Sequence, residues 1–387
     1  MPAKKRTPSI KRAKAGPTLL VGSRKGIFVY RSDSARRTWT LSGPYFLGQV
    51  VHHVVADPRD GRTWLAAVSS GHLGPTIQRT TDGGKTWTEA KRPPAFPKAP
   101  EGQAGKTVAF TCWLTPGNAS DPGLWYAGVS PHALFRSTDA GSMWEEVTGF
   151  TTGIIGNPEW KDAFFPVPEG GMTHSVLVDP RDGKHLYVSL STGGTFESRD
   201  AGATWAPLNR GVHSDFSPVK DPVVGQDPHC MAFHPLNPDR LWQQNHCGIY
   251  RLDRPGEVWE RVGNNMPKGM GDIGFPIVPH PRDEDTAWVV PMDGTSAWPR
   301  TSVAGKPAVF RTTNAGRTWQ RQDRGLPKQG WLTVKRQAFC ADGEKAVGLY
   351  VGSTSGTIWH SRDEGRTWKV LAEHLPHLFS LTIAAPR

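Results

Sequence analysis

Short apolar segments recur along the whole chain and are separated by turns rich in Gly, Pro, Asp and Asn. In one stretch, Val54–Ala56 ends at an Asp57-Pro58 turn, and the segments Thr63–Val68 and Thr76–Arg79 follow. Segments of this length, with β-branched and aromatic side chains between turn residues, are typical of β-strands. The sequence contains no run of apolar residues approaching the ~20 that a membrane-spanning helix needs. The pattern therefore predicts an all-β fold without a transmembrane helix.

A turn motif of the form Ser/Thr-x-Asp-x-Gly-x-Thr-Trp punctuates this pattern, with small variations between its copies. The Asp or Asn positions of the five clear copies are Asp82, Asp139, Asp200, Asn314 and Asp363. Two weaker copies lead to Trp39 and Trp259. The final Trp of the seven copies recurs at intervals of 48 to 61 residues, which is about the length of one four-stranded propeller blade. The spacing therefore predicts seven repeats.

The motif has a mechanical explanation. An Asp side chain can accept a hydrogen bond from the backbone N–H two residues on and so close a turn. The Gly two residues after the Asp permits a positive φ, and the Trp opens the next strand and can pack between blades. We therefore interpret the five Asp and Asn residues as structural groups that hold turns and perform no chemistry.

The first and last segments complete each other. The first repeat lacks an opening strand, because Thr18–Ser23 corresponds to the second strand of the other repeats. Ser380–Ala385 has the pattern of an opening strand with no repeat after it. Pairing these segments would close a ring and remove its free strand edges. We predict a single seven-bladed β-propeller domain over residues 18–387, closed by this pairing.

The repeated turn resembles the Asp box of BNR repeats, which occur in sialidases and in the broader group of WD40/YVTN/BNR-like and glycosyl-hydrolase-like propellers. The resemblance extends over nearly the whole chain after residue 17. It implies a propeller with its site on the face opposite the Asp boxes. It implies less about function, because this scaffold hosts hydrolases, assembly factors and receptors.

The sequence departs from sialidases at the residues that carry their activity. Sialidases have an Arg-Ile-Pro motif, an arginine triad, an acid/base Asp and a Tyr/Glu nucleophile pair. This chain has no Arg-Ile-Pro motif, and no arginine triad can be matched residue by residue. Five of the six tyrosines fall at equivalent strand positions, whereas Tyr45 is expected in a connecting loop and is a candidate catalytic residue. These departures argue against sialidase activity.

The net charge of +11 is concentrated at the N-terminus, where six of the first 15 residues are Lys or Arg and none is acidic. We expect residues 1–17 to form a disordered basic tail. The folded part has no basic stripe that we can assign to one face, which disfavours a nucleic-acid partner. The N-terminus lacks a secretory h-region, and the four cysteines form no C-x-x-C pair, so we expect a reduced, cytoplasmic protein. Cys230 and Cys247 are expected to be neighbouring buried thiols.

The predicted strand order assigns the long connections to one face of the ring. If each opening strand starts at the upper face, the Asp boxes lie on the lower face. The long connections 88–106, 145–173, 206–228 and 260–273 then lie on the upper face. Long loops on a rigid ring commonly carry function. We therefore expect the site on the upper face, opposite the Asp boxes.

Three histidines share one position in their repeats. His52, His174 and His229 each lie five residues before the first residue of an X-Pro turn, at the predicted upper start of an innermost strand. Equal offsets imply equal side-chain directions, because strand residues alternate between two sides. His132 and His246 occupy upper turns and are expected to form an outer shell.

We hypothesise that the three innermost histidines converge on the axis and bind one divalent transition metal, Zn, Fe or Cu. The arrangement resembles, in architecture only, the axial multi-His iron site of carotenoid-cleaving propellers. The alternative is that these imidazoles line a wet channel and bond to water or to backbone groups. The upper loops also hold acidic residues, of which Asp215 and Asp227 are candidate catalytic carboxylates, since carboxylate pairs suit glycoside hydrolysis.

Two classes of function follow from these observations. The first is a hydrolase or lyase that acts on a small or carbohydrate-like substrate at a His-rich site with a bound metal. The second is a non-catalytic propeller scaffold that holds a protein partner on the upper face. Metal content distinguishes the two classes.

Overall fold

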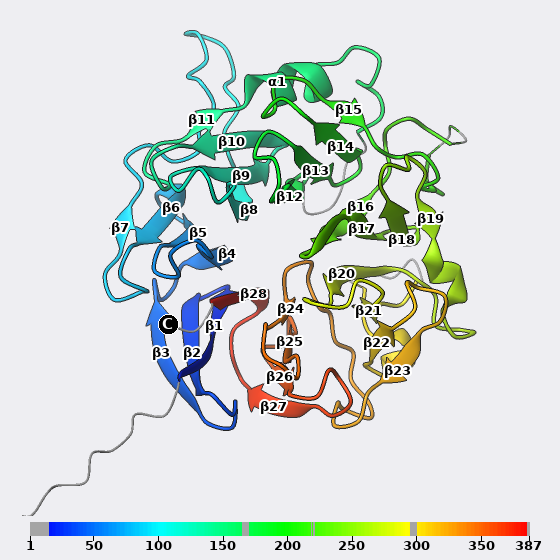
Figure 1. Cartoon of the computed structure of the whole chain (residues 1–387). Helices are drawn as coiled ribbons and strands as arrows, with labels where there is room; N and C mark the ends of the chain where they lie inside the picture. The colour runs from blue at the N-terminus through cyan, green and yellow to red at the C-terminus, as the bar shows by residue number, and fades with distance from the viewer. Residues whose placement is uncertain (1–14, 165–169, 218, 220, 295–299, 385–387) are drawn as a thin grey trace, which may run out of the picture.

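The computed structural model describes residues 15–164, 170–217, 219, 221–294 and 300–384. These residues form seven four-stranded antiparallel sheets, arranged as blades around a central axis (Figure 1). The innermost strands, β28, β4, β8, β12, β16, β20 and β24, surround the axis. The predicted seven-bladed β-propeller is confirmed.

Each blade runs from an innermost strand at the axis to an outermost strand at the rim. From the inside outward, blade 1 consists of β28 (Leu378–Ala384), β1 (Ala15–Ser23), β2 (Gly26–Asp33) and β3 (Trp39–Tyr45). Blade 2 consists of β4 (Val50–Ala56), β5 (Trp64–Ser70), β6 (Gly74–Thr80) and β7 (Thr88–Glu89). Blade 3 consists of β8 (Phe110–Pro116), β9 (Trp125–Ser130), β10 (Ala133–Ser137) and β11 (Glu145–Glu146). Blade 4 consists of β12 (Thr173–Val178), β13 (Leu186–Leu190), β14 (Gly194–Ser198) and β15 (Ala206–Pro207).

The remaining blades follow the same order. Blade 5 consists of β16 (Pro228–His234), β17 (Asn237–Asn245), β18 (Gly248–Asp253) and β19 (Glu260–Arg261). Blade 6 consists of β20 (Gly274–Pro279), β21 (Ala287–Pro291), β22 (Val309–Thr312) and β23 (Gln320–Gln322). Blade 7 consists of β24 (Phe339–Ala341), β25 (Leu349–Gly352), β26 (Ile358–Ser361) and β27 (Lys369–Ala372).

Blade 1 closes the ring as the sequence predicts. β1 pairs antiparallel with β28, from Thr18 opposite Ala384 to Ser23 opposite Leu378. A backbone hydrogen bond from the Arg24 N–H to the His377 carbonyl (2.9 Å) extends this pairing at the upper end. β1 begins at Ala15, three residues before the predicted start of the domain, and residues 1–14 of the expected tail lie outside the described residues. The first and last strands of the ring therefore belong to one blade.

The repeated turns use a different hydrogen-bond register from the predicted one. Asp82 Oδ1 accepts the N–H groups of Lys85 (2.8 Å) and Thr86 (3.0 Å), three and four residues on rather than two. The longer reach follows from two successive left-handed residues, Gly83 (φ 76°) and Gly84 (φ 84°), which curl the intervening backbone under the carboxylate. The N–H four residues on is also bound by Asp139, Asp200, Asn314 and Asp363. The turn-holding role of these residues is thus visible in the structure.

Large aromatic side chains fill the space between blades. Trp368, which ends the last turn motif, packs in one buried cluster with Trp359 of blade 7 and Trp288 of blade 6. Trp144 of blade 3 packs with Leu65 of blade 2 in the same way. Burial of such side chains is the main stabilising term of the fold. Each blade thereby covers the face of its neighbour.

The innermost strands are irregular at their upper ends. The pairing register shifts at His52, between Val51 and His53, and at His229, between Pro228 and Cys230. A comparable shift lies between His174 and Leu177, where Ser175 has a φ of 50°. A bulge of this kind adds a residue to one strand and re-aims its side chains. The alternation of side chains between the two sides of a strand is therefore interrupted at the upper ends of these strands.

The helical segments are short. They are α1 (Thr148–Phe150), η1 (Thr151–Ile155), η2 (Val262–Asn265) and η3 (Val303–Gly305). No described helix is long and apolar enough to cross a membrane. All four cysteines are described and are free thiols, so Cys230 and Cys247 are not bonded to each other.

Candidate functional site

The upper end of blade 5 brings an aspartate and two histidines together. Asp227 directly precedes β16, His229 lies within β16, and His246 lies in the turn between β17 and β18. A backbone hydrogen bond from the His246 N–H to the Asp227 carbonyl (2.9 Å) extends the pairing of β16 with β17. The three side chains are thus positioned by two paired strands rather than by a long loop.

The Asp227 carboxylate lies between the two imidazoles. Its Oδ2 is 3.3 Å from His229 Nε2 and 3.4 Å from His246 Nδ1. Its Oδ1 accepts the backbone N–H of Thr192 at 3.2 Å. The side chains of Asp227 and His229 are 10% and 4% exposed, whereas that of His246 is 33% exposed. The cluster is therefore accessible on its His246 side.

Partners outside the cluster determine which ring nitrogen carries a proton. His229 Nδ1 lies 2.5 Å from the Gly274 carbonyl oxygen, which can only accept, so Nδ1 is protonated. A neutral His229 then presents the lone pair of Nε2 to an acceptor oxygen of Asp227. Arg300 can only donate, and its Nη2 lies 3.2 Å from His246 Nε2, so the proton of a neutral His246 is on Nδ1, facing Asp227. The His229–Asp227 contact is therefore the one that requires a proton or a cation between two acceptor atoms.

The electrostatic environment keeps Asp227 ionised. Burial alone would raise the pKa of Asp227, but the adjacent His229 and His246, together with Arg336, hold the pKa of that carboxyl well below its ordinary range. Burial lowers the pKa of His229 and outweighs the opposite effect of Asp227. A metal ligand set needs a neutral imidazole beside an ionised carboxylate, so a bound ion would displace any proton held between His229 and Asp227.

The donor set fits a divalent transition metal. Within the part of the chain that the structure describes, Asp227, His229 and His246 are the group of His, Cys, Asp and Glu side chains whose ligand atoms all lie within 4.8 Å of one another. Metal bonds of ~2.0–2.2 Å to nitrogen and oxygen place neighbouring ligand atoms about 3–4 Å apart. His229 and Asp227 offer ligand atoms as they stand. His246 would ligate through Nδ1 only with its proton on Nε2, which the donor Arg300 opposes.

The structure groups the predicted histidines differently from the expectation. His229 belongs to the cluster of ligand atoms, together with His246 from the expected outer shell, while His52 and His174 do not. His174 is buried, with Nδ1 3.0 Å from Ser175 Oγ. His52 stacks on Phe110, with ring centroids 4.6 Å apart.

The other expected outer-shell histidine is His132. It is half-buried and packs against Phe164 at 5.8 Å between ring centroids. Burial lowers its pKa to about 4. His132 therefore contributes a neutral ring to the upper part of blade 3 and no ligand atom to the cluster.

The candidate catalytic residues also lie at different places. Asp227 is part of the cluster. Asp215 is exposed on the connection above blade 5, and the residue after it, Phe216, packs against His246 with ring centroids 5.6 Å apart. The sequence predicts Tyr45 in a connecting loop, and this prediction is wrong. Tyr45 ends β3, the outermost strand of blade 1, and packs against Trp87, so it lies at the rim of the ring.

Three groups that shape the cluster were absent from the sequence prediction. They are the Thr192 N–H, the Gly274 carbonyl and the Arg300 guanidinium. Two of them are backbone groups, which carry no residue signature. Arg300 lies in the connection between β21 and β22, which does not follow the repeat. A sequence signal for these contacts was therefore not available in the repeat pattern.

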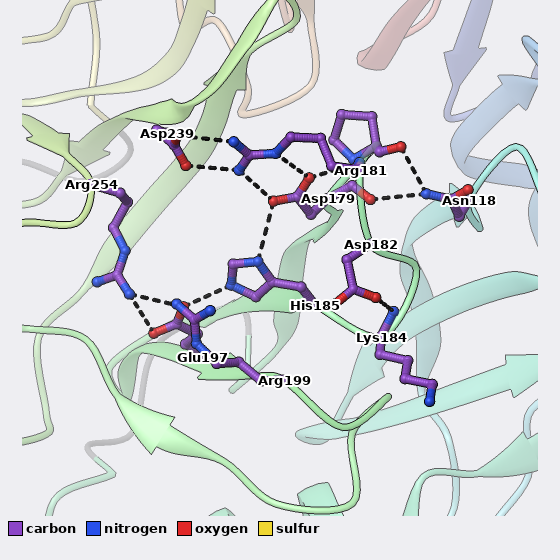
Figure 2. Close-up of polar contacts among 11 residues, drawn as sticks. Asn118, Asp179, Arg181, Asp182, Lys184, His185, Glu197, Arg199, Asp239 and Arg254 are labelled. Atoms are coloured by element: carbon purple, nitrogen blue, oxygen red, sulfur yellow. Dashed lines mark hydrogen bonds and ion pairs between the residues drawn. The ribbon is translucent and has the colours of Figure 1, made fainter.

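A second histidine–carboxylate cluster lies on the opposite face, in the turn between β12 and β13 of blade 4 (Figure 2). His185 Nδ1 is 3.2 Å from Asp179 Oδ2, and its Nε2 is 2.7 Å from Glu197 Oε1. Both carboxylates lie in the same blade as the histidine. We call this group, with the arginines around it, the His185 network.

Arginines compensate both carboxylates of the His185 network. Arg181 binds Asp179 and also Asp239 of blade 5, both at 2.7 Å. Glu197 is bound by Arg199 at 2.7 Å and by Arg254 of blade 5 at 3.1 Å. Asn118 of blade 3 donates to the Asp179 carbonyl at 3.0 Å (Figure 2). The network therefore ties three blades together with its charges matched internally.

Comparisons with known proteins identify similar propellers. A xyloglucanase from Paenibacillus sp. is 24% identical over 250 residues, which cover 54% of this chain and 22% of the relative. The chain thus spans less than a quarter of the length of that relative. No protein-family model matches the chain.

Solved structures share the fold at low sequence identity. The GH74 enzyme of Niastella koreensis has a TM-score of 0.54 at 14% identity, covering 94% of this chain and 65% of that chain. A putative 6-phosphogluconolactonase of Bacteroides fragilis has a TM-score of 0.56 at 13% identity, covering 97% and 99% of the two chains. At these identities the likeness shows the propeller fold alone.

Proposed function

We propose that the protein is a metal-dependent hydrolase that acts on a small or carbohydrate-like substrate at the upper face of blade 5. The observation that carries this proposal is the convergence of Asp227, His229 and His246, whose ligand atoms all lie within 4.8 Å of one another in a largely buried site. The similarity to a xyloglucanase supports a carbohydrate-like substrate. Asp227 and His229 would hold the ion, and His246 would join them through Nδ1 when its proton is on Nε2.

The residues of this chain have separate roles in the proposed site. Asp227 supplies a negative ligand that the Thr192 N–H holds in place. The Gly274 carbonyl orients His229 so that Nε2 faces the ion position. The exposed side of His246, next to Phe216, is the route by which substrate and water arrive. A divalent transition metal bound there would polarise a substrate oxygen and lower the pKa of a bound water to about 7.

A glycosidase with two catalytic carboxylates is less well supported. The low pKa of Asp227 makes it a poor proton donor, whereas the general acid of such enzymes has a raised pKa. Asp272, the acidic residue of the neighbouring upper connection, is held by Arg261 at 2.9 Å. Asp215 is exposed to solvent. We therefore place the metal, rather than a carboxylate pair, at the centre of the proposed chemistry.

Elemental analysis of the full chain, purified without a chelating tag, tests the metal directly. We expect about one equivalent of Zn, Fe or Cu, and loss of that metal in His229→Ala. His280→Asp is the matched control. His280 is a buried histidine whose Nδ1 accepts the Arg282 N–H, as the carboxylate of Asp57 does for Arg59 in blade 2. Metal-free protein with full hydrolytic activity on xyloglucan or smaller glycosides would contradict the proposal.

A second candidate function has its own support in the exposed apolar side chains of the upper connections. Leu73, Phe216, Val223 and Trp331 are 89%, 37%, 61% and 63% exposed. These side chains lie on connections of different blades, and each offers an apolar anchor that a partner covering this face would bury. A chain that carries no metal, hydrolyses no glycoside and is captured by one protein through Trp331 would favour a non-catalytic scaffold.

A further inference from the structure

A cavity of about 290 Å³ opens among the upper ends of the innermost strands. Its walls come from several blades, including the β1–β2 turn, the upper ends of β4, β8 and β28, and the segment before β24. The volume is at the low end for small-molecule sites. It is sufficient for a ligand about the size of one sugar.

The charged part of the wall is cationic. Arg24, Lys335 and Arg336 line the cavity, and no acidic side chain is among the described lining residues. Arg24 is exposed and forms no ion pair with any acidic residue that the structure describes. Positive charges gathered in a concave site raise the local concentration of anions. The wall therefore favours a negatively charged ligand.

Four further lining residues are aromatic, namely His52, Phe110, His377 and Phe379. His52 stacks on Phe110 and packs against Phe379 at 4.9 Å between ring centroids. His377 packs against Phe379 at 4.6 Å. Flat rings of this kind offer an apolar surface to the body of a ring-shaped ligand. The cavity thus combines an apolar wall with a cationic one.

Arg336 connects the cavity to the cluster of Asp227, His229 and His246 through one intervening residue. Arg336 lies over the ring of Phe275 at 5.4 Å, and Phe275 stacks on His229 at 4.7 Å between centroids. Arg336 also donates to Ser191 Oγ at 3.4 Å, and the next residue, Thr192, donates its N–H to Asp227. A ligand in the cavity would therefore be separated from the proposed reactive site by Arg336 and the residue that this arginine contacts.

We propose that this axial cavity binds the acidic group of a small ring-bearing molecule, a carboxylate or a phosphate, on Arg24, Lys335 and Arg336. The ring of that molecule packs on Phe110 and Phe379. This inference deepens the proposed function, since it assigns an anionic substrate class to the same upper-face site. Its binding step does not require a metal, so the two proposals can fail separately.

Calorimetric titration of the full chain tests the cavity after treatment with EDTA. The probes are D-glucuronate against D-glucose, and phenyl phosphate and benzoate against benzyl alcohol. We expect the acids to bind and the neutral molecules not to bind at up to about 10 mM, a range that covers weak sites. Binding should weaken as salt rises from about 20 to about 200 mM, because the contact is between charges. Preference for glucuronate and benzoate over phenyl phosphate identifies a carboxylate site, and the reverse preference a phosphate site.

Arg24→Gln and Lys25→Gln form a matched pair of variants. Both residues are exposed and adjacent in the β1–β2 turn, and Arg24 lines the cavity while Lys25 does not. We expect affinity for the acid to fall about tenfold in Arg24→Gln and to be unchanged in Lys25→Gln. Equal binding of acids and neutral molecules, equal effects of the two variants, or no binding of any acid by the EDTA-treated chain would overturn the inference. If a chain that never carries a metal still binds the acid, the inference about the cavity stands. Only the proposal of a metal-dependent hydrolase is then refuted.

Discussion

His229 and His185 each contact a buried carboxylate, but on opposite faces of the ring, and their surroundings differ. His185 bridges two carboxylates that arginines already compensate. His229 meets one carboxylate, and its Nδ1 is committed to a backbone carbonyl. In the first arrangement arginines pair with both carboxylates, whereas in the second two imidazoles converge on the single carboxylate of Asp227. Both clusters combine histidine with carboxylate side chains. The other groups that contact each carboxylate therefore distinguish the structural role of the His185 network from the reactive role proposed for His229.

The largest expected effect comes from neutralising Asp227. Asp227→Asn removes the negative ligand and places an amide against the two imidazoles, so we expect metal affinity to fall by at least about 100-fold. Metal titration followed by elemental analysis measures this effect. Asp215→Asn, on the same face but exposed, is the control and should bind metal normally. Normal metal binding by Asp227→Asn would contradict the proposal that Asp227, unlike the carboxylates of the His185 network, is a metal ligand.

Neutralising Glu197 should instead affect stability. Glu197→Gln leaves His185, Arg199 and Arg254 without their shared anion, so we expect the free energy of unfolding to fall by about 2–4 kcal/mol. Metal content should not change. Equilibrium denaturation measures the loss, and Glu257→Gln is the control, because Glu257 and its partner Arg210 are 65% and 73% exposed. A loss as small as that of the control would show that the network contributes little.

Arg300 distinguishes the two clusters in a third way, because its contact with His246 Nε2 opposes metal ligation through Nδ1. In Arg300→Gln the amide oxygen can accept a proton from His246 Nε2, which frees Nδ1 to ligate. We expect metal affinity to rise about tenfold, the effect of one improved outer partner. Competition against a chelator of known affinity measures the change. A fall in affinity would mean that Arg300 supports the site.

The smallest expected effect is the response of the His185 network to pH. Burial alone would raise the pKa of Glu197, but its bonds to His185 and the charges of Arg254 and Arg199 lower that pKa in the folded protein. The stabilising contribution is therefore fully present above the pKa of an unfolded Glu, about 4.3, and is lost as pH falls through the lower folded value. The difference in unfolding free energy between wild type and Glu197→Gln should narrow below about pH 4. A constant difference from pH 7 to pH 3 would contradict this assignment.

The fold was predictable from sequence because its determinants are local and repeated. The Asp82-type turns and the unpaired segment at Ser380 specify blades and closure through residues that are neighbours in sequence or obey one period. The register of the turn was not predictable in detail, because it depends on two successive left-handed residues such as Gly83 and Gly84. These two φ values are a property of the folded turn.

The site was only partly predictable, and the reason lies in the bulges. The argument from equal offsets assumed that side chains alternate along the innermost strands. At His52 and His229 the register shifts, and Ser175 beside His174 has a positive φ, so equal offsets do not give equal directions. The pairing of β16 with β17 brings Asp227 and His246 next to His229. This pairing was predictable, because both strands follow the repeat. Arg300 came from a connection outside the repeat and had no such signal.

The closure of blade 1 couples the integrity of the ring to the occupancy of its axis. Arg24 follows β1, His377 directly precedes β28 and Phe379 lies within β28, and all three line the axial cavity. A ligand bound between these three residues would contact the ends of both β1 and β28. Its binding site would be lost if these two strands separated. Binding and closure are then thermodynamically linked, so each stabilises the other by the same amount. The axial ligand would therefore stabilise the closed ring, and the free energy of opening the ring would increase with the concentration of that ligand.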